Sequence, residues 1–204
     1  MRKLVYQADS KEVAYLLEKD PKLKPLFSNR KEITVILSDH YFLSLVQTII
    51  AQQLSSKVAS VIYKRLDEYF DHDITAEKID MAKDEELRSL GLSRQKISYL
   101  KSLSTSVIQN IVQLDDLNHL SNQEIIDMLI KIKGIGVWSA QMFLMFSLGR
   151  EDVFSVLDLG LRNALKKIYE NDQLTHKEME TISELWSPYR SIVCHYLWHA
   201  WDNE

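Results

Sequence analysis

Apolar residues recur at helical spacing along almost the whole chain, with few breaks between the stripes. The stripes predict helices over residues 42–50, 58–69, 97–111, 125–130, 138–146, 161–168, 179–186 and 187–201. Only residues 33–37 and 152–157 have the pattern of extended chain, and both runs are short. The sequence therefore predicts an all-α fold of about ten helices, without a substantial sheet.

Several helix starts are marked by polar residues. Ser121-x-x-Glu124 and Thr175-x-x-Glu178 have the spacing of capping boxes, in which the first and last side chains each bond a backbone N–H of the other. Ser187-Pro188 predicts the start of the last helix, with serine as the cap and proline in the first turn.

No low-complexity linker divides the 204 residues, so the prediction is a single globular unit, 1–204, built as two lobes. Residues 1–40 plus 159–204 are predicted to form a mixed terminal lobe. Residues 41–158 are predicted to form a central helical lobe, which contains a hairpin at 130–140.

Composition narrows the function classes. No segment reaches the roughly 18 apolar residues that a membrane span requires, and the first residues lack the apolar core of a signal peptide. The single cysteine, Cys194, excludes an intrachain disulfide and a four-cysteine iron–sulfur cluster. We expect a cytoplasmic monomer, nucleoid-associated if bacterial, without a cofactor. The formal charge of −4 argues mildly against a nucleic-acid partner unless basic residues cluster locally.

Residues 129–140 join two predicted helices through a very short turn that contains Gly134 and Gly136. Glycine permits the positive-φ backbone of such a turn and lets a phosphate approach the main chain closely. The amides of both glycines would point at one anion, assisted by the positive end of the next helix dipole. Lys131 and Lys133 add positive charge beside the turn. The turn is interpreted as a grip on a DNA phosphate that does not depend on base sequence.

A G-x-G turn alone is more typical of an ordinary helix corner with a glycine C-cap. The apolar residues at fixed positions on both sides make the full pattern more specific. With them, the chain resembles the helix-hairpin-helix base-excision glycosylases, and most closely the 3-methyladenine DNA glycosylase II family. The matching segments are IIAQQLSSKVA (49–59), GLSRQKISYLKSLS (91–104), IKIKGIGVWSAQMFLMF (130–146), DVFSVLDLGLRNA (152–164) and WSPYRSIVCHYLW (186–198).

The resemblance implies a two-lobed helix-hairpin-helix glycosylase fold and a double-stranded DNA partner that contains damaged bases. It also implies the compact form of that fold, because residues 1–40 are too few for the amino-terminal sheet domain of some relatives. The DNA contacts it implies are Lys131, Lys133, Gly134, Ile135, Gly136 and Ser139.

Asp158 lies where that family has its catalytic aspartate, although an aspartate before LGLRNALKK is by itself typical of a helix N-cap. Chain geometry supports the catalytic interpretation. A helix from Trp138 to Gly149 rises about 17 Å, and the extended return over residues 152–157 covers about 20 Å. Asp158 is therefore expected to return beside the hairpin, and it can serve as both cap and catalyst.

Cleavage of an N-glycosidic bond builds oxocarbenium character on the sugar, which a carboxylate stabilises. An alkylated purine is already cationic and leaves readily, so one carboxylate is sufficient. Bifunctional relatives have a nucleophilic lysine two residues after the second glycine of the hairpin, whereas this chain has Trp138. The resemblance therefore implies a monofunctional enzyme, without lyase activity, that leaves an abasic site.

Trp138 and Trp198, with Met142, correspond to residues that line the base pocket of the family, since indole faces attract electron-poor bases. The competing interpretation is that both tryptophans belong to the core. Gln53 aligns with the residue that fills the gap left by the flipped nucleotide, and Leu54 beside it would act as an apolar wedge. The alternative for this segment is a polar helix end capped by serine.

A basic face is predicted despite the net charge, from Lys57, Arg94, Lys96, Lys101, Lys131 and Lys133. His195 and His199 have the spacing of a metal pair, but no third ligand stands at a matching position, so no side-chain metal site is expected. The family resemblance implies instead a structural monovalent cation at the backbone carbonyls of Ile130, Ile132 and Ile135.

Two positions depart from the family pattern. Ser155 and Leu157 stand where relatives often have proline and glycine, which affects the expected substrate range. The leading hypothesis is excision of 3-methyladenine and 7-methylguanine from duplex DNA. The alternatives are a glycosylase for another damaged or mismatched base, and a non-catalytic helix-hairpin-helix module that only binds DNA.

Overall fold

The computed structural model describes residues 2–202, with side chains through residue 200. The chain forms two compact units. The first comprises Met1–Leu37 and Leu144–Glu204, and the second comprises Ser38–Phe143. The predicted lobes, 1–40 plus 159–204 and 41–158, differ from these units mainly at the second boundary. Residues 144–158, including Asp158, belong to the unit that contains both ends of the chain.

The described residues form a mostly helical fold, which confirms the predicted fold class. The twelve α-helices within residues 2–202 are α1 (Lys11–Lys19), α2 (Lys24–Ser28), α3 (Tyr41–Ala51), α4 (Ser56–Tyr69), α5 (Ala76–Met81), α6 (Asp84–Ser89), α7 (Arg94–Ile108), α8 (Asn122–Leu129), α9 (Val137–Phe143), α10 (Leu159–Ile168), α11 (His176–Glu184) and α12 (Arg190–Asp202). A 3-10 turn (Pro21–Leu23) precedes α2, and a turn of π-helix (Leu144–Leu148) follows α9. None of these helices is long and apolar enough to cross a membrane.

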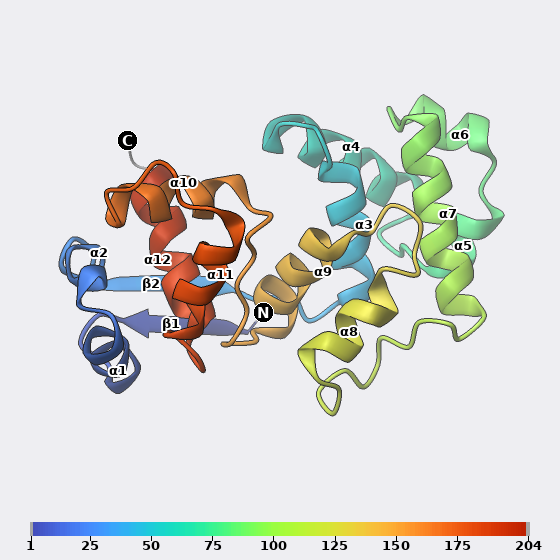
Figure 1. The fold of residues 1–204 in the computed structure, drawn as a ribbon. Helices are drawn as coiled ribbons and strands as arrows, with labels where there is room; N and C mark the ends of the chain where they lie inside the picture. Colours follow the sequence, from blue (N-terminus) through green and yellow to red (C-terminus); the bar gives the residue numbers. More distant parts are fainter. Residues whose placement is uncertain (1, 203–204) are drawn as a thin grey trace. The chain divides into compact units, whose positions relative to one another are not determined.

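The first unit contains a small sheet in addition to its helices. Strands β1 (Lys3–Gln7) and β2 (Glu32–Ile36) pair antiparallel, from Lys3 opposite Ile36 to Gln7 opposite Glu32, and lie side by side in Figure 1. The sequence predicted extended chain at 33–37 but missed β1. The small sheet is therefore an addition to the all-α prediction.

The second predicted extended run, residues 152–157, pairs with no strand in the part of the chain described. In place of a partner strand, the segment has hydrogen bonds to α12, where the Val153 N–H donates to Ser191 Oγ at 3.0 Å. The Ser191 N–H in turn donates to the Glu151 carbonyl at 2.8 Å. The apolar pattern of this segment reflects its burial. The element that covers it is helix α12 rather than a strand.

The capping predictions had different outcomes. Both capping boxes, at 121–124 and 175–178, are confirmed, with reciprocal bonds in each. The expected start of the last helix at 187–188 is wrong, since α12 begins at Arg190. Ser187 does not cap it, because its hydroxyl donates to Asp152 Oδ2 at 2.9 Å. Arg190 completes this cluster with a bond from Nε to Asp152 Oδ1 at 2.6 Å.

A buried carboxylate ties the N-terminal segment to the C-terminal helices within the first unit. Asp20, at the end of α1, accepts a hydrogen bond from Trp186 Nε1 at 2.9 Å and another from the Tyr169 hydroxyl. A buried charge is tolerated only when such donors replace water. These bonds explain how a short N-terminal segment joins the C-terminal helices in one core.

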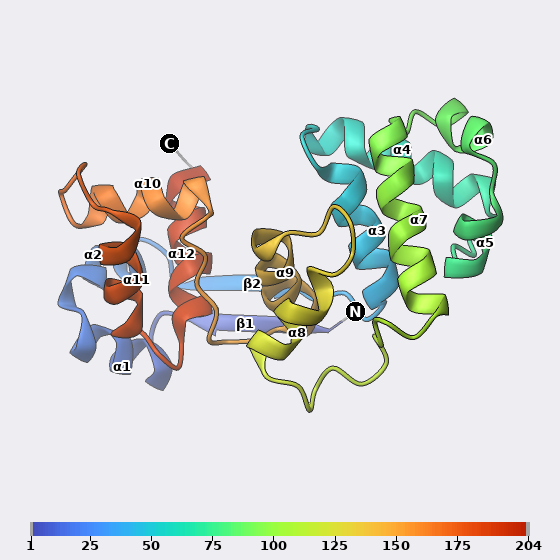
Figure 2. The same cartoon turned by 45° about the vertical axis from the view of Figure 1, so that its right-hand side comes forward.

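The second unit is built around α3, whose Leu45, Val46, Ile49 and Ile50 are fully buried. Helices α4 and α7 pack against it, and α5 packs against α7. Figure 2 shows α3 and α7 side by side. Lys96, near the start of α7, donates to the Gln52 carbonyl at the end of α3, and the Gln52 side chain donates to Gly134, so these two helix ends and the hairpin meet.

Candidate functional site

The hairpin between α8 and α9 is a compact turn in which the two glycines have different surroundings. Gly134 has φ +91°, and a Cβ on it would lie 2.2 Å from a ring carbon of Tyr99. Gly136 lacks a positive φ, and a Cβ on it would meet no atom within 4 Å. Glycine is therefore required at position 134 both by the positive φ of the turn and by the close contact with the Tyr99 ring. Gly136 instead leaves the main chain open to an approaching group.

The predicted residues at the start of α9 line one surface pocket of about 570 Å³. Its walls include Gly134, Trp138, Ser139, Met142 and Gln53. Trp138 is 40% exposed, so its indole lies at the surface rather than in the core. A pocket of this volume has the size of ligand sites in general.

The remaining hairpin residues divide between core and surface. Ile132 and Ile135 are buried, so Ile135 offers no exposed side chain for its predicted DNA contact, whereas Ile130 and Lys131 are exposed. The Ile132 carbonyl accepts the Ile135 N–H at 3.0 Å, which leaves its second lone pair for a cation. Neutral carbonyl oxygens are a suitable donor type for such an ion, and the cation remains a prediction.

The turn between α3 and α4 presents the predicted wedge residues. Gln53 is exposed in the left-handed region at φ 58°, and Leu54 is 36% exposed. Ser55 caps α4, since its hydroxyl accepts the Val58 N–H at 3.4 Å. The structural interpretation of this segment therefore holds for Ser55, while the two residues before it project from the surface.

Lys96 supports this turn through its ammonium group and also lines the pocket beside Trp138. Its Nζ donates to the carbonyl of Gln52 at 2.7 Å, to that of Ile49 at 3.3 Å and to that of Ile50. Burial lowers the pKa of the Lys96 ammonium. The prediction that Lys96 belongs to a DNA-facing basic strip is therefore wrong.

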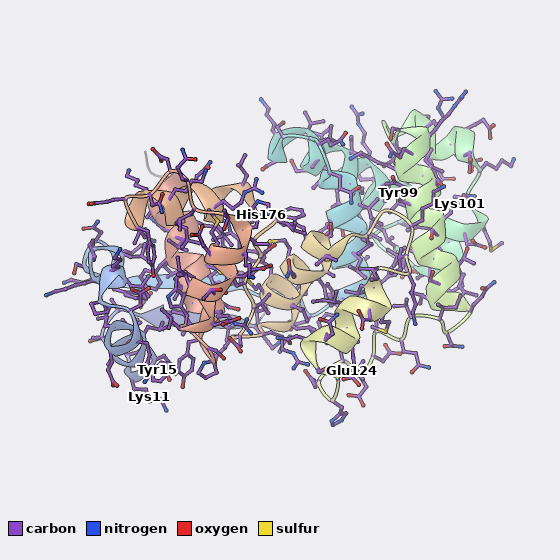
Figure 3. All side chains as sticks on the ribbon, viewed as in Figure 1. Lys11, Tyr15, Tyr99, Lys101, Glu124 and His176 are labelled. Carbon is purple, nitrogen blue, oxygen red and sulfur yellow. The ribbon has the colours of Figure 1, made fainter. Side chains whose placement is uncertain are left out.

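Lys101 is also not free to extend the predicted basic face. Its Nζ donates to the Ala82 carbonyl at 2.8 Å and pairs with Asp84 at 3.3 Å. Tyr99 and Lys101 leave α7 on opposite sides, Tyr99 toward the hairpin and Lys101 toward α5 and α6 (Figure 3). Lys133 lies at the hairpin and donates to Ser98 Oγ at 3.0 Å. The other three of the six predicted basic residues have exposed side chains, at Lys57, Arg94 and Lys131.

Asp158 lies in the first unit and caps α10, as predicted. Its Oδ1 accepts the Leu161 N–H at 2.9 Å and the indole N–H of Trp198, also at 2.9 Å. Gly160 makes room for this pair, because a Cβ there would lie 3.2 Å from Asp158 Oδ1 and 3.4 Å from the Trp198 ring. The carboxylate is thus held in one orientation by a main-chain donor and a side-chain donor.

Trp198 is half-buried in an aromatic cluster. Its ring centroid lies 5.4 Å from that of Phe146 and 5.7 Å from that of His195, which also stacks on Tyr6. Burial lowers the pKa of His195 to about 4, so the ring is neutral at neutral pH, and its Nε2 has no hydrogen-bond partner among the described residues. In the described part of the chain no three His, Cys, Asp or Glu side chains form a metal-binding group, and His199 does not make one with His195.

The two departures from the family pattern flank this site. Ser155 is fully buried, and its carbonyl accepts the Asp158 N–H at 3.2 Å, which fixes the backbone leading into the cap. Leu157 is 49% exposed directly before the carboxylate.

The structure thus divides the predicted residues between the units. Asp158 and Trp198 meet in the first unit, and the hairpin, Trp138, Met142 and the wedge turn meet in the second. Sequence reasoning missed the supporting residues, which are Gln52, Tyr99 and Gly160. Gln52 and Tyr99 carry no local signal, since both contact Gly134 from distant segments, whereas Gly160 lies only two residues from Asp158.

Comparisons with known proteins agree over most of the chain. The sequence model of the HhH-GPD superfamily of base excision DNA repair proteins matches residues 46–188. A Saccharomyces cerevisiae protein named DNA-3-methyladenine glycosylase is 32% identical, with 90% of this chain and 77% of that protein covered. A crystal structure of DNA-3-methyladenine glycosidase from Bacillus halodurans superimposes with a TM-score of 0.90 at 35% identity, covering 98% of this chain and 93% of that one.

A structure of the Schizosaccharomyces pombe 3-methyladenine DNA glycosylase in complex with abasic DNA is also similar. It has a TM-score of 0.80 at 31% identity and covers 93% of this chain and 95% of that one. The matched range of the superfamily includes the hairpin and Asp158 but ends before Trp198.

Proposed function

Because the chain belongs to the HhH-GPD superfamily of base excision DNA repair proteins, we propose that it is a DNA glycosylase for alkylated purines. Its substrates would be 3-methyladenine and 7-methylguanine in duplex DNA, and its product an abasic site. The relatives named DNA-3-methyladenine glycosylase support this substrate class.

The observation that carries the proposal is the held carboxylate of Asp158. Two N–H donors orient Oδ1 at the start of α10. As the base departs, positive charge develops on the sugar, and a carboxylate already fixed in place stabilises that charge without reorganising. A cationic alkylated base needs little help from a general acid, which suits this arrangement.

The hairpin would hold the DNA backbone. The open main chain at Gly136 and the amides at the start of α9 would bind one phosphate, with Lys131 and Lys133 nearby. A monovalent cation on the hairpin carbonyls would add positive charge there. Gln53 or Leu54 would enter the duplex where the nucleotide leaves it, and Trp138 with Met142 would offer a surface to the extruded base.

Trp138 also bears on the reaction type. It occupies the hairpin position at which bifunctional relatives have lysine, and an indole cannot form a Schiff base with C1′. We therefore expect hydrolysis alone. Treating the reacting enzyme–DNA mixture with borohydride should trap no covalent adduct, whereas a bifunctional glycosylase in parallel should give one.

The function is tested by single-turnover excision on a panel of otherwise identical duplexes. These carry 3-methyladenine, 7-methylguanine, hypoxanthine, uracil, 8-oxoguanine or no lesion. Release of the two alkylated purines, well above the other four, is expected. Release of only a deaminated or oxidised base would move the enzyme to another substrate class. Binding without release from any duplex would make the protein a non-catalytic DNA-binding module.

A further inference from the structure

One hydrogen bond connects the hairpin to the wedge turn within the second unit. Gln52 Nε2 donates to the Gly134 carbonyl at 2.7 Å, and Gln52 is the residue directly before Gln53. The bond therefore runs from the residue beside the projecting wedge to the glycine at the centre of the hairpin.

The turn on one side of this bond is held in a conformation that it would not adopt alone. Gln53 has φ 58°, which costs a non-glycine residue about 1–2 kcal/mol. Lys96 compensates by donating to three carbonyls at the end of α3, including that of Gln52 at 2.7 Å. The Gln52 backbone is therefore fixed from α7.

The hairpin on the other side is fixed from the same helix. Tyr99, one turn after Lys96, fills the space beside Gly134, and its hydroxyl accepts a hydrogen bond from Gln95 Nε2 at 2.6 Å. One face of α7 thus carries the supports of both elements. Among the bonds described, the Gln52 amide joins the two elements directly.

We infer that Gln52 is a positioning residue that couples the hairpin to the wedge turn, so that binding a phosphate sets the depth at which Gln53 or Leu54 enters the duplex. The inference rests on the proposed function, because it assigns roles to both elements in base extrusion. Gln52 also lines the pocket beside Trp138, but the coupling acts through its bond to Gly134 and requires no contact between Gln52 and DNA.

The test replaces Gln52 with methionine, which keeps the length of the side chain and removes its N–H donor. Single-turnover excision of 3-methyladenine from a fully paired duplex should fall about 5- to 10-fold, the effect of one net hydrogen bond. Affinity for undamaged duplex should stay within about twofold, since the hairpin main chain is unchanged. On a duplex whose lesion lies in a one-nucleotide bulge, the variant should approach the wild-type rate, because that base is already unstacked.

The matched control is Gln123→Met, on α8. Its amide donates to Asp127 at 2.8 Å on an exposed helix face, so the same substitution removes one glutamine hydrogen bond away from the turn. The control should excise paired and bulged lesions at wild-type rates. A wild-type rate for Gln52→Met on the paired duplex would overturn the inference. An equal loss on both duplexes would also overturn it, because that outcome indicates a general structural defect or a direct contact of Gln52 with the extruded base.

A second measurement does not depend on excision. The duplex carries 2-aminopurine, whose fluorescence rises when it unstacks, at the target position. Wild-type protein at saturation should raise the signal, and Gln52→Met should raise it less. Equal signals would overturn the inference even if the wild type released no alkylated purine, an outcome that by itself would count only against the proposed function.

Discussion

The two units hold their functional groups in opposite ways. In the second unit, side chains hold a stretch of main chain, because Tyr99, Gln52 and Lys96 support the hairpin and the adjoining turn. In the first unit, the main chain and an indole hold one side chain, the carboxylate of Asp158. The proposed DNA grip therefore uses backbone groups, and the proposed chemistry uses a single carboxylate.

This difference determines how substitutions should act. A backbone group cannot be replaced, so changes in the second unit should work through the shape of the turn. The carboxylate can be replaced without changing the shape, so changes in the first unit should separate chemistry from stability.

The largest effect is expected for Asp158→Asn. The asparagine Oδ1 can still accept both N–H donors, so the cap of α10 and the Trp198 contact should remain. Excision should fall about 100- to 1,000-fold, because the negative charge is lost from the transition state. Single-turnover kinetics measure the rate, and urea denaturation should show little change in stability.

Asp158→Ala is the companion variant. It should lose excision to a similar extent and also about 1 kcal/mol of stability, since α10 loses its cap. If Asp158→Asn excised at the wild-type rate, Asp158 would be only a cap, and the enzymatic interpretation of this unit would fail.

The two hairpin glycines should give opposite results when changed to alanine. Gly134→Ala places a Cβ against Tyr99 at a positive φ and should cost about 3 kcal/mol of unfolding free energy. Gly136→Ala meets open space, so its stability should stay within about 0.5 kcal/mol of wild type. Urea denaturation measures both.

Only Gly136→Ala then isolates the proposed phosphate contact. Its affinity for duplex DNA, measured by fluorescence anisotropy, should fall about fivefold with or without a lesion. Unchanged affinity would remove Gly136 from the DNA interface. Adding Tyr99→Ala to Gly134→Ala should relieve the clash, which would show that the first glycine is needed for packing.

The pH dependence of the free energy of unfolding should show whether the aromatic cluster around His195, beside Trp198, excludes water. Burial holds the pKa of His195 at about 4, whereas the ring in an unfolded chain titrates near 6.5. The unfolded state therefore binds the proton more tightly, and stability should fall as pH drops from about 6.5 to about 4. The full loss is about 3 kcal/mol, at roughly 1.4 kcal/mol per pKa unit.

Urea denaturation of wild type and His195→Phe between these pH values measures the effect. The phenylalanine keeps a ring among Tyr6, Phe146 and Trp198 and should flatten the dependence. The same change at His119, whose side chain is 82% exposed, should leave the dependence in place. Equal slopes for wild type and His195→Phe would show that the ring is open to water.

Much of the fold follows from local sequence pattern. The helices with wide apolar stripes and the two capping boxes were predicted, because these features depend on residues three or four positions apart. Strand β1 was missed because Val5, between the inward-facing Leu4 and Tyr6, is apolar yet 49% exposed, which hides the alternation in the sequence. Residues 152–157 were misassigned because burial under α12 gives the same apolar pattern as a strand.

The site could be predicted only where one residue carries the chemistry. Asp158, Trp138 and Gly134 stand in motifs, so the sequence pointed to them. The supports depend on contacts between distant segments, as when Lys96 reaches carbonyls 44 to 47 positions away. On the sequence, that lysine is indistinguishable from a solvated residue on a helix face, which is why its role was predicted wrongly.

The smallest effect is expected from removing one donor to the carboxylate. The first unit offers a matched pair, since the indoles of Trp198 and Trp186 each donate to an aspartate at 2.9 Å, the first to Asp158 and the second to Asp20. Trp198→Phe should lower excision about 5- to 10-fold, because the carboxylate loses part of its orientation. Duplex affinity should be unchanged. Trp186→Phe should instead lower stability and leave the rate of the folded enzyme intact, since Asp20 lies in the core. Equal rate losses in both variants would mean that the Trp198 bond, like the Trp186 bond, is structural. The orientation of the Asp158 carboxylate for catalysis would then be assigned to its bond from the Leu161 N–H.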